Sequence, residues 1–228
     1  MKRSEINKAI DSALAILREN NIHLPAFAHW SPAQWKENAP RTANIREIGL
    51  GWDVTDFGTG DFARVGSVLF TLRNGSAAKP SAGTPYAEKL ILQRHASRQE
   101  IPFHFHRCKT EDIINRGGGV LMLELYNSLA DDTLDKSGEI HLRMDGLPQT
   151  LPAGAAVEIA PGGSITLTPG LFHRFWAKQG AGDLICGEVS SVNDDRTDNV
   201  FLAVGKRFSH IEEDESPRYV LCNEYKDI

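Results

Sequence analysis

Residues 104–111 read HFHRCKTE, and this stretch decides both the predicted fold and the predicted site. If it forms a β-strand, alternate side chains point to the same side, so His104 and His106 share one face. Phe103 and Phe105 then share the opposite face, which we expect to be turned toward a core. The paired imidazoles indicate a metal site, and a hydrogen-bonded pair on a solvated sheet face is the alternative.

Two further residues complete a candidate metal site. Glu111 lies five residues after His106, and a tight turn over residues 107–108 would bring its carboxylate back toward the imidazoles. His173 stands in PGGSITLTPGLFHRFWA, after a Gly-Gly turn, a β-branched strand and a Pro-Gly turn. Three imidazoles and one carboxylate suit a divalent metal of intermediate softness. We expect the other histidines to be surface or locally bonded residues: His23, His29, His95, His141 and His210.

The chain after residue 48 consists of short apolar runs separated by turn signals. The run at 67–75, SVLFTLRNG, predicts a strand that enters an Asn-Gly turn, and residues 76–85 predict a polar loop. Further strands are predicted over residues 89–96, 119–127, 139–146, 156–160, 164–170, 172–177 and 183–191. Residues 211–225 predict an acidic loop and one last strand. Because no amphipathic helices intervene, the pattern indicates an all-β sandwich or barrel.

The N-terminal residues have a different pattern, which predicts a helical extension. Apolar residues recur at helical spacing after Ser4, a candidate N-cap: Ile6, Ile10, Ala13, Leu14 and Leu17. A second short helix is predicted from Ser31, with Gln34 completing a capping box. We expect the aromatic residues between 27 and 35 to pack in a core or an interface.

Composition and charge exclude several classes of partner. The chain has 228 residues and a formal net charge of −5, so nothing in its electrostatics favours nucleic acid or a membrane. No apolar stretch approaches the roughly 20 residues of a membrane span. The N-terminus lacks an apolar signal-peptide core, and the three cysteines have no disulfide-framework or zinc-binding spacing. We therefore expect a cytoplasmic protein.

The candidate metal residues also fit a known pattern. The stretch from His104 to Gly118 resembles the first cupin motif, H-x-H-x4-E-x6-G. The stretch from Gly163 to His173 resembles the second, with one residue fewer between its proline and its histidine. Over nearly its whole length the chain resembles the D-lyxose isomerase family of cupins. The segments that carry this resemblance are MKRSEINKAIDSAL, EIPFHFHRCKTEDIINRGGG, PGLFHRFWA and GEVSSVNDDRTDN.

This resemblance implies a fold, a reaction and a cofactor. The implied fold is an all-β cupin jelly-roll barrel of six to eight strands with the metal inside it. We expect a single domain in which residues 1–47 form a helical extension packed on a barrel of residues 48–228. The implied reactions interconvert D-lyxose with D-xylulose and D-mannose with D-fructose. The implied metal is typically manganese, with zinc, cobalt or iron as alternatives, and the implied assembly is a homodimer.

Isomerisation through a cis-enediol needs a base for the carbon-bound proton and an electrophile for the developing oxyanion. A bound divalent metal serves as the electrophile. Glu188 in DLICGEVSS is our first candidate for the base, because an acid in an apolar strand is costly to bury without a role or a partner. A salt bridge or a rim position is the alternative. Lys109 would face the same interior, where it would hydrogen-bond the substrate or move protons between the two oxygens. The alternative is an exposed lysine at a strand end.

Four residues are candidates for binding the sugar hydroxyls. Lys89 and Gln93 share parity on the strand before the histidine pair, and the polar face of an edge strand is the alternative. The charged run at 193–199, NDDRTDN, is typical of a solvated loop. If this run instead folds over the barrel mouth, Arg196 or Asp198 would contact the open-chain sugar. Because the sequence has no phosphate-binding loop, a free pentose or hexose fits better than a sugar phosphate.

Three rival functions are compatible with the same residues. Cupins with three histidines and one glutamate also activate dioxygen, so a cupin dioxygenase is the first rival. A sugar-phosphate isomerase and a non-catalytic sugar-binding cupin are the others. Oxygen uptake, inhibition by phosphate and loss of metal ligands would discriminate among them.

Overall fold

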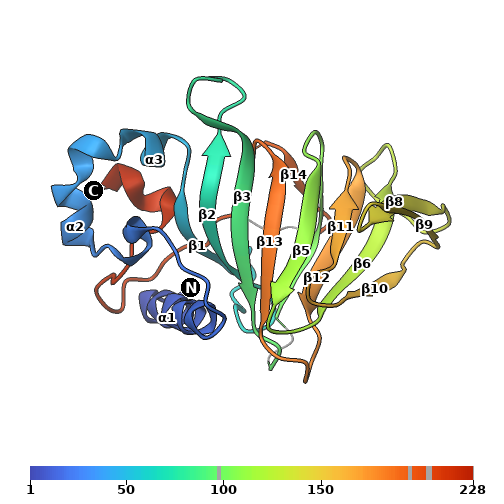
Figure 1. Ribbon diagram of the computed structural model, residues 1–228, viewed down its shortest axis with the longest axis horizontal. Helices are drawn as coiled ribbons and strands as arrows, with labels where there is room; N and C mark the ends of the chain where they lie inside the picture. The colour runs from blue at the N-terminus through green and yellow to red at the C-terminus, as the bar shows by residue number, and fades with distance from the viewer. Residues whose placement is uncertain (97–98, 195–196, 204–206, 228) are drawn as a thin grey trace.

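The computed structural model describes residues 1–96, 99–194, 197–203 and 207–227. Two antiparallel β-sheets curl into a barrel, and helices pack against one side of it (Figure 1). The helical elements are α1 (Arg3–Glu19), η1 (Ala26–His29), α2 (Pro32–Glu37), η2 (Ala39–Arg41), α3 (Ala43–Glu47) and η3 (Cys222–Asp227). None of the described helices is long and apolar enough to cross a membrane. The predicted β-barrel with an N-terminal helical segment is confirmed.

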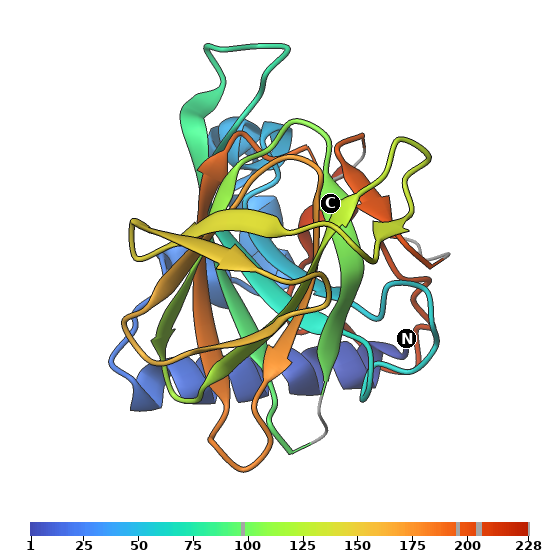
Figure 2. The same ribbon diagram turned by 90° about the vertical axis from the view of Figure 1, so that its right-hand side faces the viewer.

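Each sheet forms one wall of the barrel, as the view toward its open end shows (Figure 2). The larger sheet contains, in spatial order, β1 (Gly51–Thr55), β2 (Ser67–Gly75), β3 (Gly83–Gln93), β13 (Leu184–Ser191), β5 (Glu111–Gly117), β11 (Ser164–Leu167), β8 (Ile140–Met144) and β9 (Leu147–Leu151). The smaller sheet contains β10 (Ala156–Ile159), β6 (Leu121–Ser128), β12 (Leu171–Ala177), β4 (Glu100–His106) and β14 (Asn199–Phe201), with β7 (Leu134–Asp135) paired to β6. Because β4 and β5 lie in different sheets, the chain crosses between walls just after His106.

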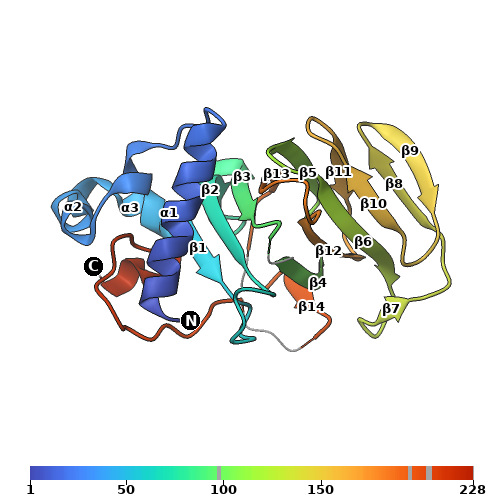
Figure 3. The same ribbon diagram turned by 90° about the horizontal axis from the view of Figure 1, so that it is seen from below.

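The strands β1, β2 and β3 are buried on both faces because α1 covers their outer side (Figure 3). Trp52 and Phe70 are cross-strand partners with ring centroids 4.8 Å apart, and they pack in one cluster with Ile6 and Ile10 of α1. The sequence of a strand that is covered on both faces is a continuous apolar run rather than an alternation of apolar and polar residues. Residues 90–92 of β3, LIL, have this pattern. The predicted apolar face of the first helix is confirmed, since Ile6, Ile10, Ala13 and Leu17 are buried.

The N-cap predicted at Ser4 is wrong, because α1 begins one residue earlier, at Arg3. The Ser4 N–H and hydroxyl donate to the Asp214 carboxylate at 2.9 and 2.7 Å. The Arg3 N–H donates to the Glu212 carbonyl at 2.9 Å. The first N–H groups of the helix are thus satisfied by the C-terminal tail rather than by a local cap. The capping box predicted for the second helix, between Ser31 and Gln34, is confirmed.

The last strand predicted in the tail is also wrong, because residues 222–227 form the 3-10 helix η3. Within residues 211–225, Glu212 and Leu221 make isolated bridges, to Lys2 and Trp52. The Glu224 carboxylate accepts from the Leu221 N–H at 3.0 Å, which favours a tight turn. The Tyr225 hydroxyl donates to the Leu50 carbonyl, and its ring packs on Trp35. The tail therefore packs against the N-terminal helical segment.

The Asn-Gly pair at the end of SVLFTLRNG does not form a hairpin turn. Both residues belong to β2, and the turn follows over residues 76–82. Gly75 pairs with Gly83, and a Cβ at Gly75 would lie 1.9 Å from the Thr84 carbonyl oxygen, so this close approach requires glycine. β3 consequently starts at Gly83, six residues before the predicted strand. Asn74 is buried, and it serves the site described below.

Phe105 of β4 is buried in apolar packing as predicted, and the imidazole face of the strand is the one turned toward the barrel interior. His104 and His106 line the barrel interior, whereas Phe105 and Phe103 lie on the other face of the sheet. Phe105 is buried there against Phe172, with ring centroids 4.7 Å apart. The imidazoles therefore lie among the other polar side chains that line the barrel interior.

Candidate active site

Four side chains predicted as metal ligands converge inside the barrel. His104 and His106 come from β4, Glu111 from the start of β5 and His173 from β12. His173 is the cross-strand partner of His104. One potential ligand atom from each residue lies within 4.8 Å of the others, and all four side chains are buried. The spacing H-x-H places two imidazoles on one face, and the crossing to the other sheet places the carboxylate opposite them.

The loop between β4 and β5 is held by Asp198, which precedes β14. Asp198 accepts from the N–H groups of Cys108 and Lys109 at 2.8 and 3.2 Å, and its carbonyl accepts from the Arg107 N–H at 3.0 Å. Its carboxylate oxygen Oδ2 also lies 3.6 Å from Nδ1 of His106. Asp198 therefore fixes the loop, and its carboxylate faces the outer nitrogen of His106 without a hydrogen bond to it.

Backbone carbonyls orient the other two imidazoles. Nδ1 of His104 lies 2.9 Å from the Pro102 carbonyl, and Nδ1 of His173 lies 3.0 Å from the Leu171 carbonyl. Because a carbonyl oxygen only accepts, we assign the ring proton of each to Nδ1. This assignment leaves the lone pair of each Nε2 available as a ligand, which is the arrangement that metal-binding histidines use.

The contacts of Glu111 fit a bound cation. Its Oε1 lies 3.1 Å from Nε2 of His173 and 3.3 Å from Nε2 of His106, yet neither contact has hydrogen-bond geometry. A carboxylate oxygen that faces an imidazole lone pair is repelled unless a positive ion lies between them. Borderline nitrogen and oxygen donors in this number suit a divalent transition metal. The donor set therefore fits the divalent metal that the sequence predicted.

The protonation states of these residues also favour metal binding. Burial lowers the pKa of His104 well below its usual value, helped by the neighbouring His173 and His106. Burial likewise lowers the pKa of His106. Burial opposes ionisation of Glu111, but the Lys109 ammonium and His106 hold the pKa of this carboxyl well below its usual range. Near neutral pH the site thus offers neutral imidazoles at His104 and His106 and an ionised carboxylate at Glu111.

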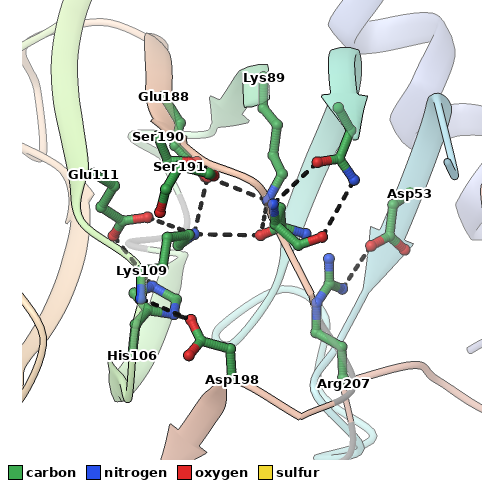
Figure 4. Close-up of polar contacts among 12 residues, drawn as sticks. Asp53, Lys89, His106, Lys109, Glu111, Glu188, Ser190, Ser191, Asp198 and Arg207 are labelled. Atoms are coloured by element: carbon green, nitrogen blue, oxygen red, sulfur yellow. Dashed lines mark hydrogen bonds and ion pairs between the residues drawn. The ribbon is translucent and has the colours of Figure 1, made fainter. Parts of the chain in front are cut away.

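A second buried carboxylate, Glu188, lies beside the cluster between two lysines (Figure 4). Lys109 and Lys89 place their Nζ atoms 2.9 and 3.2 Å from Oε1 of Glu188, and the Ser190 hydroxyl donates to the same oxygen at 3.3 Å. Burial alone would raise the pKa of Glu188, but Lys109 and Lys89 outweigh it and keep that pKa below its usual value. Lys109 also reaches Oε2 of Glu111 at 2.6 Å, so one ammonium joins both carboxylates.

An asparagine pair that the sequence analysis missed supports the lysines. Oδ1 of Asn193 accepts from Lys89 at 2.8 Å and from Lys109 at 3.3 Å. Asn74 of β2 holds Asn193 in place, because its Oδ1 accepts from the Asn193 N–H and its Nδ2 donates to the Asn193 carbonyl. The Asn-Gly signal at 74–75 concealed this role, since it resembles a turn.

The cluster and Glu188 share one cavity of about 430 Å³, including its open mouth. Polar lining residues include the metal-ligand candidates on β4 and β5 together with Lys89, Lys109, Glu188 and Arg207. The apolar lining residues are Phe57, Leu69, Ile91, Ile101, Ile113, Phe175 and Phe201. The cavity thus combines a reactive polar wall with an apolar wall.

The predicted sugar-binding residues are distributed unevenly around this cavity. Lys89 lines it. Gln93 does not, since it lies farther along β3, where its amide donates to the Gly66 carbonyl at 3.4 Å. Asp198 lies behind His106, at the position described above. Arg196 lies outside the residues that the structure describes.

Solved structures with a similar fold include sugar isomerases at low sequence identity. The L-ribose isomerase of Acinetobacter sp. DL28, solved in complex with L-ribose, superposes with a TM-score of 0.61 at 15% identity. The match covers 93% of this chain and 98% of that one. The L-ribose isomerase of Geodermatophilus obscurus gives a TM-score of 0.57 at 16% identity, with the same coverage. This similarity confirms the predicted cupin-like fold.

Sequence comparisons identify closer relatives. The D-lyxose/D-mannose isomerase of Serratia proteamaculans is 47% identical over 226 residues, which cover 99% of this chain and 98% of that protein. The D-lyxose/D-mannose isomerase of Escherichia coli O157:H7 is 47% identical over the full length of both proteins. The family model described as D-lyxose isomerase matches residues 1–225. A match of this extent, together with the predicted motifs in place, means that the chain belongs to the D-lyxose isomerase family.

Proposed function

We propose that this protein is a metal-dependent aldose–ketose isomerase that interconverts D-lyxose with D-xylulose and D-mannose with D-fructose. Membership of the D-lyxose isomerase family supports the reaction class, and both aldoses appear in the names of the two relatives. Within the chain itself, the observation that carries the proposal is a buried, ionised Glu188 beside a three-histidine, one-glutamate cluster in a single cavity.

The cluster of His104, His106, Glu111 and His173 would hold the divalent ion. When bound, the ion acts as a Lewis acid toward neighbouring sugar oxygens and so stabilises the charge that develops on them. We propose manganese as the resident metal, with zinc, cobalt and iron as alternatives, because this donor set accepts several borderline ions.

Glu188 acts as the base that moves the carbon-bound proton. Its low pKa keeps it ionised at neutral pH, and its place in the cavity lining gives it access to substrate. Because Lys89, Lys109 and Ser190 all contact Oε1, we assign the other oxygen, Oε2, to the substrate. Glu188 removes the proton from C2 of the aldose and returns it to C1 of the resulting cis-enediol, while the hydroxyl proton passes from O2 to O1.

The two lysines have different roles. Lys109 contacts Glu111, Glu188 and Asn193, which match the three donors of an ammonium group, so we assign it to positioning the metal ligand and the base together. Lys89 contacts only Glu188 and Asn193 among the described residues. Its third N–H is therefore our candidate donor to a sugar hydroxyl.

Asp198 fits a positioning role better than the sugar contact predicted from the sequence. Its two oxygens accept from the backbone of the β4–β5 loop and face the outer nitrogen of His106. A carboxylate behind a metal-binding histidine fixes the ring and raises its basicity. The homodimeric state implied by the family resemblance and the cytoplasmic location expected from the sequence remain proposals.

The test begins with chelator-treated protein to which single divalent metals are returned. D-Lyxose and D-mannose are then assayed for ketose formation in the absence of oxygen. We expect ketose only with metal, and we expect His106→Ala to abolish it, whereas His141→Ala on the exposed side of β8 keeps full activity. In deuterated water, deuterium should appear at C1 of the ketose, because Glu188 exchanges its proton with solvent.

Each rival function has its own signature in this test. Metal-loaded protein that binds metal but forms no ketose would refute the proposal, and oxygen uptake would then indicate a dioxygenase. Turnover of a sugar phosphate in preference to the free sugar would indicate a sugar-phosphate isomerase. Deuterium incorporation supports the enediol, whereas ketose formation without it would keep a hydride shift as the alternative.

A further inference from the structure

A buried ion pair on the cavity wall has no part in the chemistry described above. Arg207 lines the same cavity as Glu188 and the metal-ligand candidates. Its Nη1 lies 2.5 Å from Oδ2 of Asp53, and the two side chains are 12% and 4% exposed. A guanidinium this buried is uncommon in proteins unless it is paired and has a use.

The main chain on either side of Arg207 is fixed to the end of β1. The Thr55 hydroxyl donates to the Arg207 carbonyl at 2.8 Å. The Asp56 N–H donates to the Ser209 hydroxyl at 2.8 Å, and that hydroxyl donates in turn to the Asp56 carboxylate. These contacts, with the ion pair to Asp53, hold the guanidinium at a defined point on the wall, as a binding group requires.

This point lies away from the reacting end of the site. The cross-strand row from Asp53 runs through Leu69 and Ile91 to Cys186, so the pair is three strands from the strand of Glu188. At a strand spacing of ~4.8 Å, the backbones are ~14 Å apart along the sheet. Figure 4 shows Asp53 and Arg207 on the opposite side of Lys89 from Glu111.

The charge of the pair determines which ligand it suits. Asp53 balances Arg207 locally, so the pair does not present a net positive charge that would select a phosphate or a carboxylate. A fixed guanidinium remains a directional donor to neutral oxygen acceptors. The Arg207–Asp53 pair is therefore suited to bind a neutral hydroxyl group of a ligand.

We propose that Arg207, held by Asp53, binds a hydroxyl at the far end of the open-chain sugar and so selects neutral chains long enough to reach it. This proposal rests on the proposed function for the position of C1 and C2 beside Glu188. A substrate whose first two carbons lie at Glu188 extends its remaining carbons along the cavity toward Arg207. The pair is thus a specificity-determining element, remote from the proton transfer.

The test uses two polyols that no isomerase can convert. D-Mannitol has six carbons and erythritol has four, so we expect only D-mannitol to reach from the metal-ligand cluster to Arg207. Their dissociation constants for manganese-loaded protein are measured by calorimetry in the wild type, in Arg207→Met and in Arg64→Met. Arg64 is the matched control because its side chain is 81% exposed and its only ion pair is to Asp61 within the described chain.

We expect the wild type and Arg64→Met to bind D-mannitol more tightly than erythritol. In Arg207→Met, D-mannitol binding should weaken by roughly ten- to a hundredfold, the usual loss of a hydrogen bond to a charged group. Erythritol binding should change less than about twofold, since erythritol does not reach the pair. Equal losses for both polyols, or an unchanged preference for D-mannitol, would overturn the proposal.

Two features keep the result decisive. If Arg207→Met does not fold, Arg207→Lys replaces it in the test. Lysine keeps the positive charge opposite Asp53 but lacks the planar guanidinium with its several donors. It should therefore still reduce the preference for D-mannitol several-fold. An unchanged preference in that variant would overturn the proposal. Because polyol binding needs no turnover, absence of ketose would refute the isomerase proposal without affecting this measurement.

Discussion

Replacing Glu188 with glutamine tests the proposed base and the charge balance of the cavity together. The amide has nearly the same shape as the carboxylate, so packing is preserved, but it cannot accept a proton from carbon. A positioned general base contributes about 10²- to 10⁴-fold to the rate of proton transfer. We therefore expect kcat for D-lyxose to fall by at least about a hundredfold, while manganese still binds at the separate cluster.

The same change leaves two buried lysines without their shared carboxylate. Lys89 and Lys109 lie 3.2 and 2.9 Å from Oε1 of Glu188, so their Nζ atoms are no more than the sum of these distances, about 6.1 Å, apart. At an effective dielectric constant of about 20, two unit charges at this separation repel by ~3 kcal/mol. Glu111 still partners Lys109, so we expect a net loss of roughly 2–3 kcal/mol of unfolding free energy for Glu188→Gln.

Urea unfolding of metal-free protein measures this loss, and manganese titration with a ketose assay measures the other two quantities. Adding Lys89→Met to Glu188→Gln should restore part of the stability, because it removes one of the two repelling charges, yet it should restore no activity. A kcat within about threefold of the wild type would refute Glu188 as the base. A double variant no more stable than the single one would refute the charge-balance reasoning.

Three further outcomes follow from individual contacts. Lys89→Met should shift the acid limb of the pH profile of kcat to higher pH. Lys89 helps keep the pKa of Glu188 below its usual value, and the base works only when it is ionised. Lys79→Met, at an exposed lysine, is the control and should leave the acid limb in place. Arg3→Met should reduce the unfolding free energy by ~2 kcal/mol, because it removes a buried guanidinium that joins the first helix to Glu213 and Glu224. Urea unfolding measures this loss, and an unchanged midpoint of the urea transition would contradict it. Manganese at about a hundredfold above its dissociation constant should raise the unfolding free energy by ~2.7 kcal/mol in the wild type but not in His106→Ala, as followed by thermal melting.

The sequence predicted the barrel and the ligand cluster because both depend on local, periodic signals. Alternation on a strand is enough to place His104 and His106 on one face, and the spacing to Glu111 is short enough for a single crossing between sheets. The run of strands separated by turn residues likewise identifies a β-barrel before any contact is known. His173, in the second motif, follows turn residues that start a strand, which is again a local signal.

The errors lie where distant segments decide the outcome. Ser4 has the composition of an N-cap, but Asp214, 210 residues away, takes its N–H. Asn74 and Gly75 have the composition of a hairpin turn, but the loop near Asn193 needs the asparagine and the approach of Thr84 needs the glycine. Propensity describes what a segment does alone, and tertiary hydrogen bonds override it at such positions.

The same limit explains why Lys109 was predicted as a proton carrier and fits a positioning role in the structure. From the sequence, a lysine two residues before a metal-ligand glutamate is simply a cation near a reactive centre. In the folded chain it contacts Oε2 of Glu111 and Oε1 of Glu188, so a single positive charge keeps the proposed metal ligand and the proposed base ionised at once. Buried carboxylates close to each other cannot both stay charged without such a partner. The isomerase site therefore depends on an ion-pair geometry that becomes visible only when β5 and β13 lie side by side.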